Sequence, residues 1–125
     1  MPRAILILMI AAFAACSSAP EREQARVCRM TIPPLNPEGA RIAVLRAVET
    51  DTNEVRVDYV VESGGRSRQR WVLCRFAEIP RSAIQPALEG LTTDEGEVPG
   101  ASVYLMERFW LNTPDSLEAD PGGAS

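Results

Sequence analysis

Hydrophobic and polar residues alternate through the middle of the chain. Between residues 54 and 62 every second residue is apolar, and most of the residues between them are polar. A period of two residues predicts a β-strand with one buried face. The apolar residues on that face are Val55, Val57, Tyr59 and Val61.

A Ser63-Gly64-Gly65-Arg66 turn leads from this strand into a second one, between residues 68 and 76. Two glycines between two alternating runs are typical of a tight antiparallel hairpin. Trp71 and Leu73 lie on one face of the second run, and bulky residues also occupy its other face. This predicts a central strand that is covered on both sides. The residues of the other face are Val72, Cys74 and Phe76.

Two weaker runs extend the predicted sheet. The run from Arg41 to Glu49 reads as a strand that enters the 54–62 strand through a turn at residues 51–53. Its apolar face carries Ile42, Val44 and Val48. Residues 87–93 predict a short edge strand, and the acidic residues 94–97 predict a solvated turn. We therefore expect a small antiparallel sheet of about three to four strands.

A helix is predicted before the sheet, from Ala19 to Met30. Ser18 stands at the cap position, with Glu21 three residues later and Pro20 in the first turn. The inner side of this helix would carry Val27, Cys28 and Thr31. A strand over residues 26–32 is the alternative, because Cys28, Met30 and Ile32 also alternate.

A second helix is predicted from Pro99 to Leu111. Its apolar residues fall on one broad arc, which we expect to cover the sheet face that bears Val55, Val57 and Tyr59. The alternative is a helix that docks a partner protein through Tyr104 and Trp110. The residues of the arc are Val103, Leu105, Met106, Phe109 and Trp110. Sheet and helices together predict an α+β fold.

These elements place one α+β domain at residues 21–112. The residues after it, 113–125, are acidic and rich in glycine, with few apolar side chains to join a core. Such a composition predicts a disordered tail.

The composition excludes many functions. The chain has no His, and all 13 basic residues are Arg, so His-based dyads, imidazole metal ligands and lysine Schiff bases are absent. The net charge of −4 has the wrong sign for a nucleic-acid binder. We expect no enzymatic activity, no catalytic residue, no metal and no cofactor. A carboxylate-only glycosidase would need paired acids in a cleft, and the candidates Glu49, Asp58 and Glu62 are more simply explained as solvated surface charge.

The first 16 residues have the pattern of an export signal. Arg3 precedes an apolar run over residues 4–15, which is too short to span a bilayer as a helix. The run ends in Phe13-Ala14-Ala15-Cys16, which resembles the lipobox of bacterial lipoprotein signal peptides, with Phe where Leu is usual. The resemblance implies a signal peptide at 1–15, a lipid on Cys16, and a short linker at 16–20. Cleavage after Ala12-Phe13-Ala14 without lipidation is the alternative.

If Cys16 carries a lipid, Cys28 and Cys74 remain as one pair in an oxidising compartment. Their disulfide would close a loop of 46 residues (74 minus 28), worth roughly 4 kcal/mol on a chain-entropy argument. Two buried free thiols are the alternative. The order Cys28, Leu-Asn-Pro, Val-x-Val-x-Tyr, Gly, Cys-x-Phe also resembles small uncharacterised exported bacterial domains. That resemblance implies a disulfide and an α+β fold but no activity.

The lipobox resemblance thus implies a bacterial envelope lipoprotein that faces the periplasm, and Ser17 directly after Cys16 resembles the lipoproteins that Gram-negative cells sort to the outer membrane. Its domain would bind an envelope partner or give structural support. The alternative is a soluble exported domain that binds an anionic ligand through arginines. The arginines concerned are Arg66, Arg68, Arg70 and Arg75. Arg75 lies on the opposite strand face from Arg68 and Arg70. Ion pairs across the hairpin with Glu54, Asp58 and Glu62 are the default explanation of this group.

Overall fold

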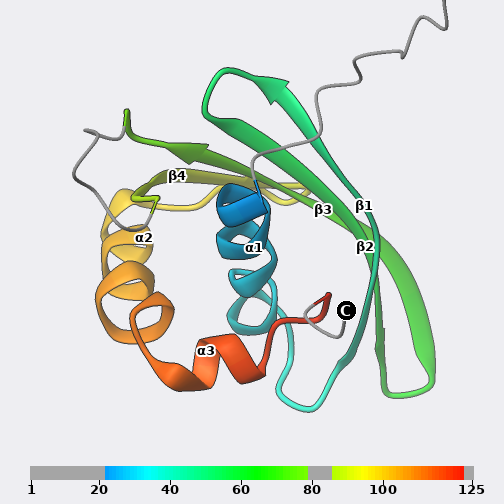
Figure 1. Ribbon diagram of the computed structural model, residues 1–125. Helices are drawn as coiled ribbons and strands as arrows, with labels where there is room; N and C mark the ends of the chain where they lie inside the picture. The colour runs from blue at the N-terminus through cyan, green and yellow to red at the C-terminus, as the bar shows by residue number, and fades with distance from the viewer. Residues whose placement is uncertain (1–21, 79–85, 123–125) are drawn as a thin grey trace, which may run out of the picture.

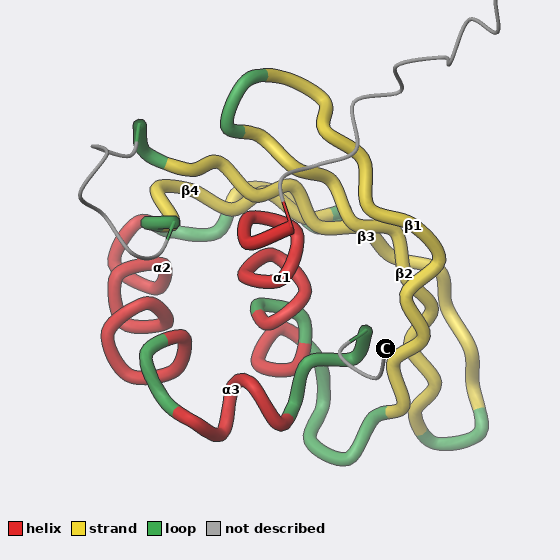
Figure 2. The backbone as a smooth tube through the Cα atoms, in the orientation of Figure 1, coloured by secondary structure: helices red, strands yellow, loops and turns green. Residues whose placement is uncertain are grey.

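The computed structural model describes residues 22–78 and 86–122. They form a five-stranded antiparallel sheet with helices on one of its faces (Figures 1 and 2). The spatial order of the strands follows their order in the chain. The predicted α+β class is confirmed, and the sheet has five strands where three to four were expected. The strands are β1 (Arg41–Asp51), β2 (Glu54–Ser63), β3 (Arg66–Phe76), β4 (Leu88–Thr93) and β5 (Gly96–Glu97).

The hairpin between β2 and β3 has the predicted turn. Gly64 and Gly65 both have positive φ angles, 60° and 76°, which glycine adopts without strain. Val57 lies opposite Val72, and Val55 lies opposite Cys74. The predicted dry face of β2 is confirmed, because all four of its apolar residues are buried: Val55, Val57, Tyr59 and Val61.

Two details of the sheet differ from the sequence prediction. The β1–β2 register shifts at Leu45, and an extra residue in one strand turns the following side chains to the other face. Val48 is therefore 41% exposed, and Ala47 takes the inward position. β3 is the middle strand as predicted, but Trp71 and Leu73 are only partly buried, because the helices cover the opposite face alone.

Helix α1 (Arg22–Met30) confirms the predicted N-terminal helix over the described residues, and the alternative strand is wrong. Its inner side packs on β2 and β3. The predicted inward residues Val27, Cys28 and Thr31 are all buried. A short 3-10 helix, η1 (Pro33–Leu35), then ends the helical segment at the two prolines. The leader, Cys16 and the predicted helix cap lie outside the described residues.

The C-terminal helix is displaced from its predicted position. Helix α2 (Gly100–Met106) continues as a π-helical segment, η2 (Glu107–Leu111), and α2 lies beside β4. The sheet surface formed by Val55 and Val57 is covered by α1 instead (Figure 1). Val103 and Leu111 are buried, whereas Leu105 and Phe109, which were predicted to face the core, are 52% and 66% exposed.

The prediction of a disordered tail is wrong for residues 113–122. Helix α3 (Pro114–Glu118) follows η2 directly, and its Ser116 is fully buried. Beyond α3, the Asp120 carboxylate accepts two hydrogen bonds from the Arg29 guanidinium of α1, at 2.9 and 3.0 Å. An ion pair between residues 91 positions apart leaves no signature in local composition.

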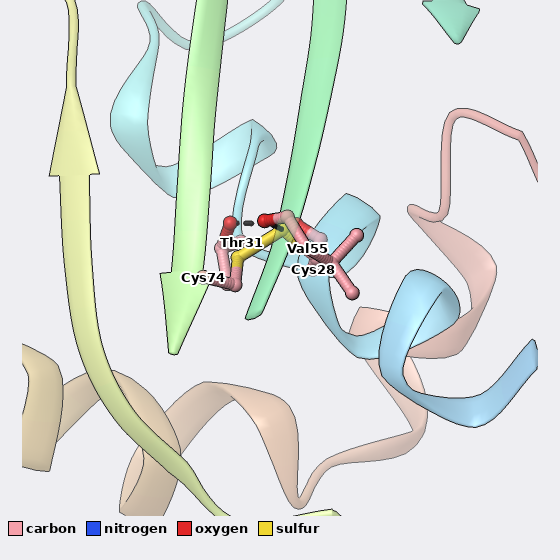
Figure 3. Close-up of a disulfide and its surroundings, with 4 residues drawn as sticks. All are labelled: Cys28, Thr31, Val55 and Cys74. Carbon is pink, nitrogen blue, oxygen red and sulfur yellow. Dashed lines mark hydrogen bonds between the residues drawn. A yellow bond between two sulfur atoms is a disulfide. The ribbon is translucent and has the colours of Figure 1, made fainter. Parts of the chain in front are cut away.

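Cys28 and Cys74 form the predicted disulfide, which joins α1 to the middle of the sheet (Figure 3). Both residues are fully buried. Beside them, Thr31 Oγ1 donates a hydrogen bond of 2.7 Å to the carbonyl oxygen of Cys28. The bridge therefore lies in the centre of the core, among Val27, Met30, Val55, Val72 and Leu91.

Candidate functional site

Three of the four arginines selected from the sequence gather at one pocket. Arg66, Arg68 and Arg70 follow one another at every second position of β3, so all three project from the face that carries the core further along the strand. The pocket has a volume of about 370 Å3. We call it the arginine pocket, and its other lining residues are Leu35, Asn36, Pro37, Val61, Ser63 and Glu95.

Arg70 forms the inner wall of the arginine pocket and is only 4% exposed. Its Nε donates to Asp94 Oδ1 at 2.9 Å. Its Nη1 donates to the Leu35 carbonyl at 3.2 Å and to Asn36 Oδ1 at 2.8 Å. A buried guanidinium with this many acceptors is held rigidly. Arg70 therefore fixes the η1 loop and the β4–β5 turn against the sheet.

Tyr59 lies behind Arg70 and is completely buried. Its hydroxyl oxygen accepts a hydrogen bond of 3.1 Å from Asn36 Nδ2. Burial raises the pKa of Tyr59 above its ordinary value, because the phenolate would lose its hydration. The residue is thus a neutral acceptor that positions Asn36, whose side chain also contacts Arg70.

Arg68 and Arg66 form the outer wall. Arg68 Nη2 lies 3.0 Å from Glu95 Oε1, and both side chains are well exposed, at 59% and 64%. An exposed pair of this kind contributes little stability. Arg66 makes no ion pair with any residue that the structure describes. The pocket thus offers one unpaired guanidinium and a second one held only by a surface carboxylate.

Arg75 lies apart from the other three arginines, as the strand alternation predicts. Its guanidinium is on the opposite face of the sheet, 3.5 Å from Glu97 Oε1. The expected pairing of these arginines with acids of β2 is wrong. Their partners are Asp94 and Glu95, in the turn between β4 and β5, and Glu97 in β5 itself, although residues 94–97 were predicted to form a solvated turn.

The open face of the sheet carries a second charged cluster, around Asp58. This residue was predicted to be solvated, but it is only 4% exposed, because two arginines cover it. Arg46 Nε lies 2.9 Å from Asp58 Oδ2, and Arg56 Nη2 lies 3.1 Å from Oδ1. Burial acts to raise the pKa of Asp58, but the hydrogen bonds from Arg46 and Arg56 outweigh it and hold the pKa below its ordinary value. Arg56 also stacks 4.7 Å from the ring centre of Trp71.

The structure does not bring the three candidate acids of a glycosidase together. Asp58 and Glu62 lie on the open face of β2, four residues apart, which separates them by about 13 Å. Glu49 belongs to β1 and pairs with Val55, on the helix-covered face. Within residues 22–78 and 86–122 there is also no group of three side chains placed to bind a metal ion.

The two residues of the predicted partner surface on the C-terminal helix differ in exposure. Tyr104 is 60% exposed, but Trp110 is partly buried, and its Nε1 donates a hydrogen bond of 2.7 Å to the Met30 carbonyl. The exposed neighbours of Tyr104 are instead Leu105 and Phe109. A helical wheel drawn from the sequence misses this, because it assumes one uniform helical pitch.

Comparisons with protein-family models, with curated protein sequences and with solved structures find no significant match to this chain.

Proposed function

We propose that this chain is a bacterial envelope lipoprotein whose folded domain binds a ligand or partner without catalysis. A lipid on Cys16 would hold the domain at the periplasmic side of a membrane, with Ser17 favouring the outer membrane. The observation that supports this most directly is the disulfide, because it uses Cys28 and Cys74 and leaves Cys16 as the one remaining cysteine. A cysteine at the end of an apolar leader is where bacterial lipoproteins are acylated.

No helix within residues 22–78 and 86–122 has the length and apolar character needed to cross a membrane.

Metabolic labelling with a palmitate analogue tests the lipid. Cells that express the wild type should yield a labelled protein, and Cys16→Ala should abolish the label. Ser17→Ala is the matched control, since it changes the neighbouring residue and leaves the sulfur in place. Equal labelling of wild type and Cys16→Ala would refute lipidation at this position.

A second candidate function is the binding of a small anionic molecule in the arginine pocket. Arg66 has no ion-pair partner among the described residues, and the walls are partly apolar, formed by Leu35, Pro37 and Val61. A guanidinium forks onto a carboxylate or a phosphate with two hydrogen bonds. A volume of about 370 Å3 lies at the lower end of the range for small-molecule sites.

Calorimetric titration with citrate and with pyrophosphate at low salt tests this pocket. Arg66→Gln should weaken binding about tenfold or more, since hydrogen bonds to charged groups contribute about 1.5–3 kcal/mol. Arg75→Gln is the matched control, because its guanidinium lies on the other face. Glu95→Gln should strengthen binding by freeing Arg68, while Glu97→Gln should not. Equal affinities in all four variants would exclude the pocket.

A further inference from the structure

The exposed side of the C-terminal helix carries apolar residues that the core does not use. Tyr104, Leu105 and Phe109 are 60%, 52% and 66% exposed. We call these three residues the apolar helix face. Single exposed apolar side chains are common on soluble proteins, but three on one side of one helix indicate a contact surface.

Charged side chains are few on the C-terminal helix, although the chain as a whole is acidic. Among residues 100–112 the only exposed ionised side chain is Arg108, because Glu107 is partly buried and its Oε1 accepts a hydrogen bond from the Leu88 amide at 3.3 Å. Arg108 lies 5.7 Å from the Phe109 ring centre, and its Nη1 lies 3.4 Å from the Tyr104 hydroxyl. The exposed acid Glu89 lines a pocket together with Tyr104 and Arg108. Aromatic rings, Leu and an exposed Arg are nevertheless typical of helices that lie at a membrane interface.

The first helix of the folded domain lies beside the end of the same C-terminal helical segment. Arg26 of α1 lines a groove together with the C-terminal end of η2 and with α3. The other residues of the groove are Leu111, Asn112, Thr113, Pro114 and Leu117. Leu117 is itself 52% exposed. Arg22 precedes Arg26 by one helical turn, about 6 Å along the helix axis.

Only five residues lie between Cys16 and Arg22. Even when fully extended, the six residue-to-residue steps from Cys16 to Arg22 reach about 20 Å. A lipid on Cys16 would therefore hold Arg22, the first residue of α1, within about 20 Å of the bilayer. Helix α2 lies in the same helical layer as α1, on one side of the sheet (Figure 1).

We propose that the apolar helix face docks on the lipid bilayer itself. Leu105 and Phe109 would enter the boundary between headgroups and acyl chains, while Tyr104 and Arg108 would contact phosphates. This inference rests on the proposed lipidation of Cys16, which brings the domain to the surface. It adds a fixed orientation, in which the open sheet face points away from the membrane.

Site-directed fluorescence on the full lipidated protein tests this orientation. Leu105→Cys, or Phe109→Cys in a second sample, is labelled with an environment-sensitive dye and reconstituted into vesicles of phosphatidylethanolamine and phosphatidylglycerol. The introduced thiol is the one that reacts, because Cys16 carries lipid and Cys28 and Cys74 are bonded to each other. Val48→Cys is the matched control, since Val48 is also apolar and 41% exposed but lies on the open sheet face.

The dye at residue 105 or 109 should shift to shorter wavelength and be quenched several-fold by brominated lipid, with no change at residue 48. If the protein floats with the vesicles while all three dyes stay in water, docking is refuted and the surface belongs to a protein partner. If the protein does not float with the vesicles, the lipid anchor itself is refuted, and docking with it. A circular dichroism spectrum of each labelled variant verifies that it is folded.

Discussion

The ion pair between Asp120 and Arg29 gives the sharpest test of how the C-terminal segment is held. The Asp120 side chain is 5% exposed and that of Arg29 is 20% exposed, and the carboxylate also accepts a hydrogen bond of 3.0 Å from the Gly122 amide. Asp120→Asn removes the charge and keeps the shape. Because the change leaves a largely buried guanidinium without its counter-charge, we expect the free energy of unfolding to fall by about 2 kcal/mol.

The effect should depend on pH in a defined direction. Burial acts to raise the pKa of Asp120, but hydrogen bonds from Arg29 and Gly122 outweigh it, so the folded-state pKa lies below its ordinary value of 3.8. A group with a lowered folded-state pKa contributes stability above its unfolded pKa. That contribution is fully present at neutral pH and is lost as the pH falls through the folded-state pKa.

Urea unfolding of wild type and Asp120→Asn, followed by far-ultraviolet circular dichroism, measures the difference. It should be about 2 kcal/mol at pH 7 and should shrink steadily below pH 4. Glu118→Gln, an exposed change in the same segment, should have almost no effect at any pH. A loss of stability that is equal at pH 7 and at pH 3 would refute the electrostatic explanation.

Three further predictions concern the core and the arginine pocket. Reduction of the Cys28–Cys74 disulfide, which spans 46 residues, should lower the free energy of unfolding by roughly 4 kcal/mol, as urea curves with and without reductant will measure. Arg70→Gln should lower the free energy of unfolding by about 3 kcal/mol, because it leaves Asp94 without its buried partner. Thermal unfolding measures this loss, and a change below about 0.5 kcal/mol would contradict the prediction. Tyr59→Phe should lower the free energy of unfolding by only about 1 kcal/mol, because it removes one hydrogen-bond acceptor from Asn36. The near-ultraviolet circular dichroism of the tryptophans should stay unchanged.

The strands could be predicted because the residues that define each strand lie close together in the sequence. The alternation of Val55, Val57, Tyr59 and Val61 with polar residues defines both the strand and its buried face, and Gly64-Gly65 defines the hairpin. The disulfide followed from counting cysteines once Cys16 was set aside as the lipidated residue.

What the sequence could not reveal depends on distant partners or on small irregularities. The carboxylate partner of Arg70 is Asp94, 24 positions away, and only the folded sheet brings them together. The exposure of Phe109 follows from a π-helical segment, which changes the angle between successive side chains. The buried state of Asp58 follows from two arginines that extend over it, which no strand pattern encodes.

The extra residue at Leu45 has a consequence for the behaviour of the protein at high concentration. β1 forms one border of the sheet, and its free backbone amides and carbonyls are a template on which another extended chain could assemble. A regular eleven-residue border would favour stacking into fibrils, but the bulge breaks the spacing of those groups. The irregularity thus protects the protein from aggregation in a crowded compartment, at the expense of one apolar side chain left in water.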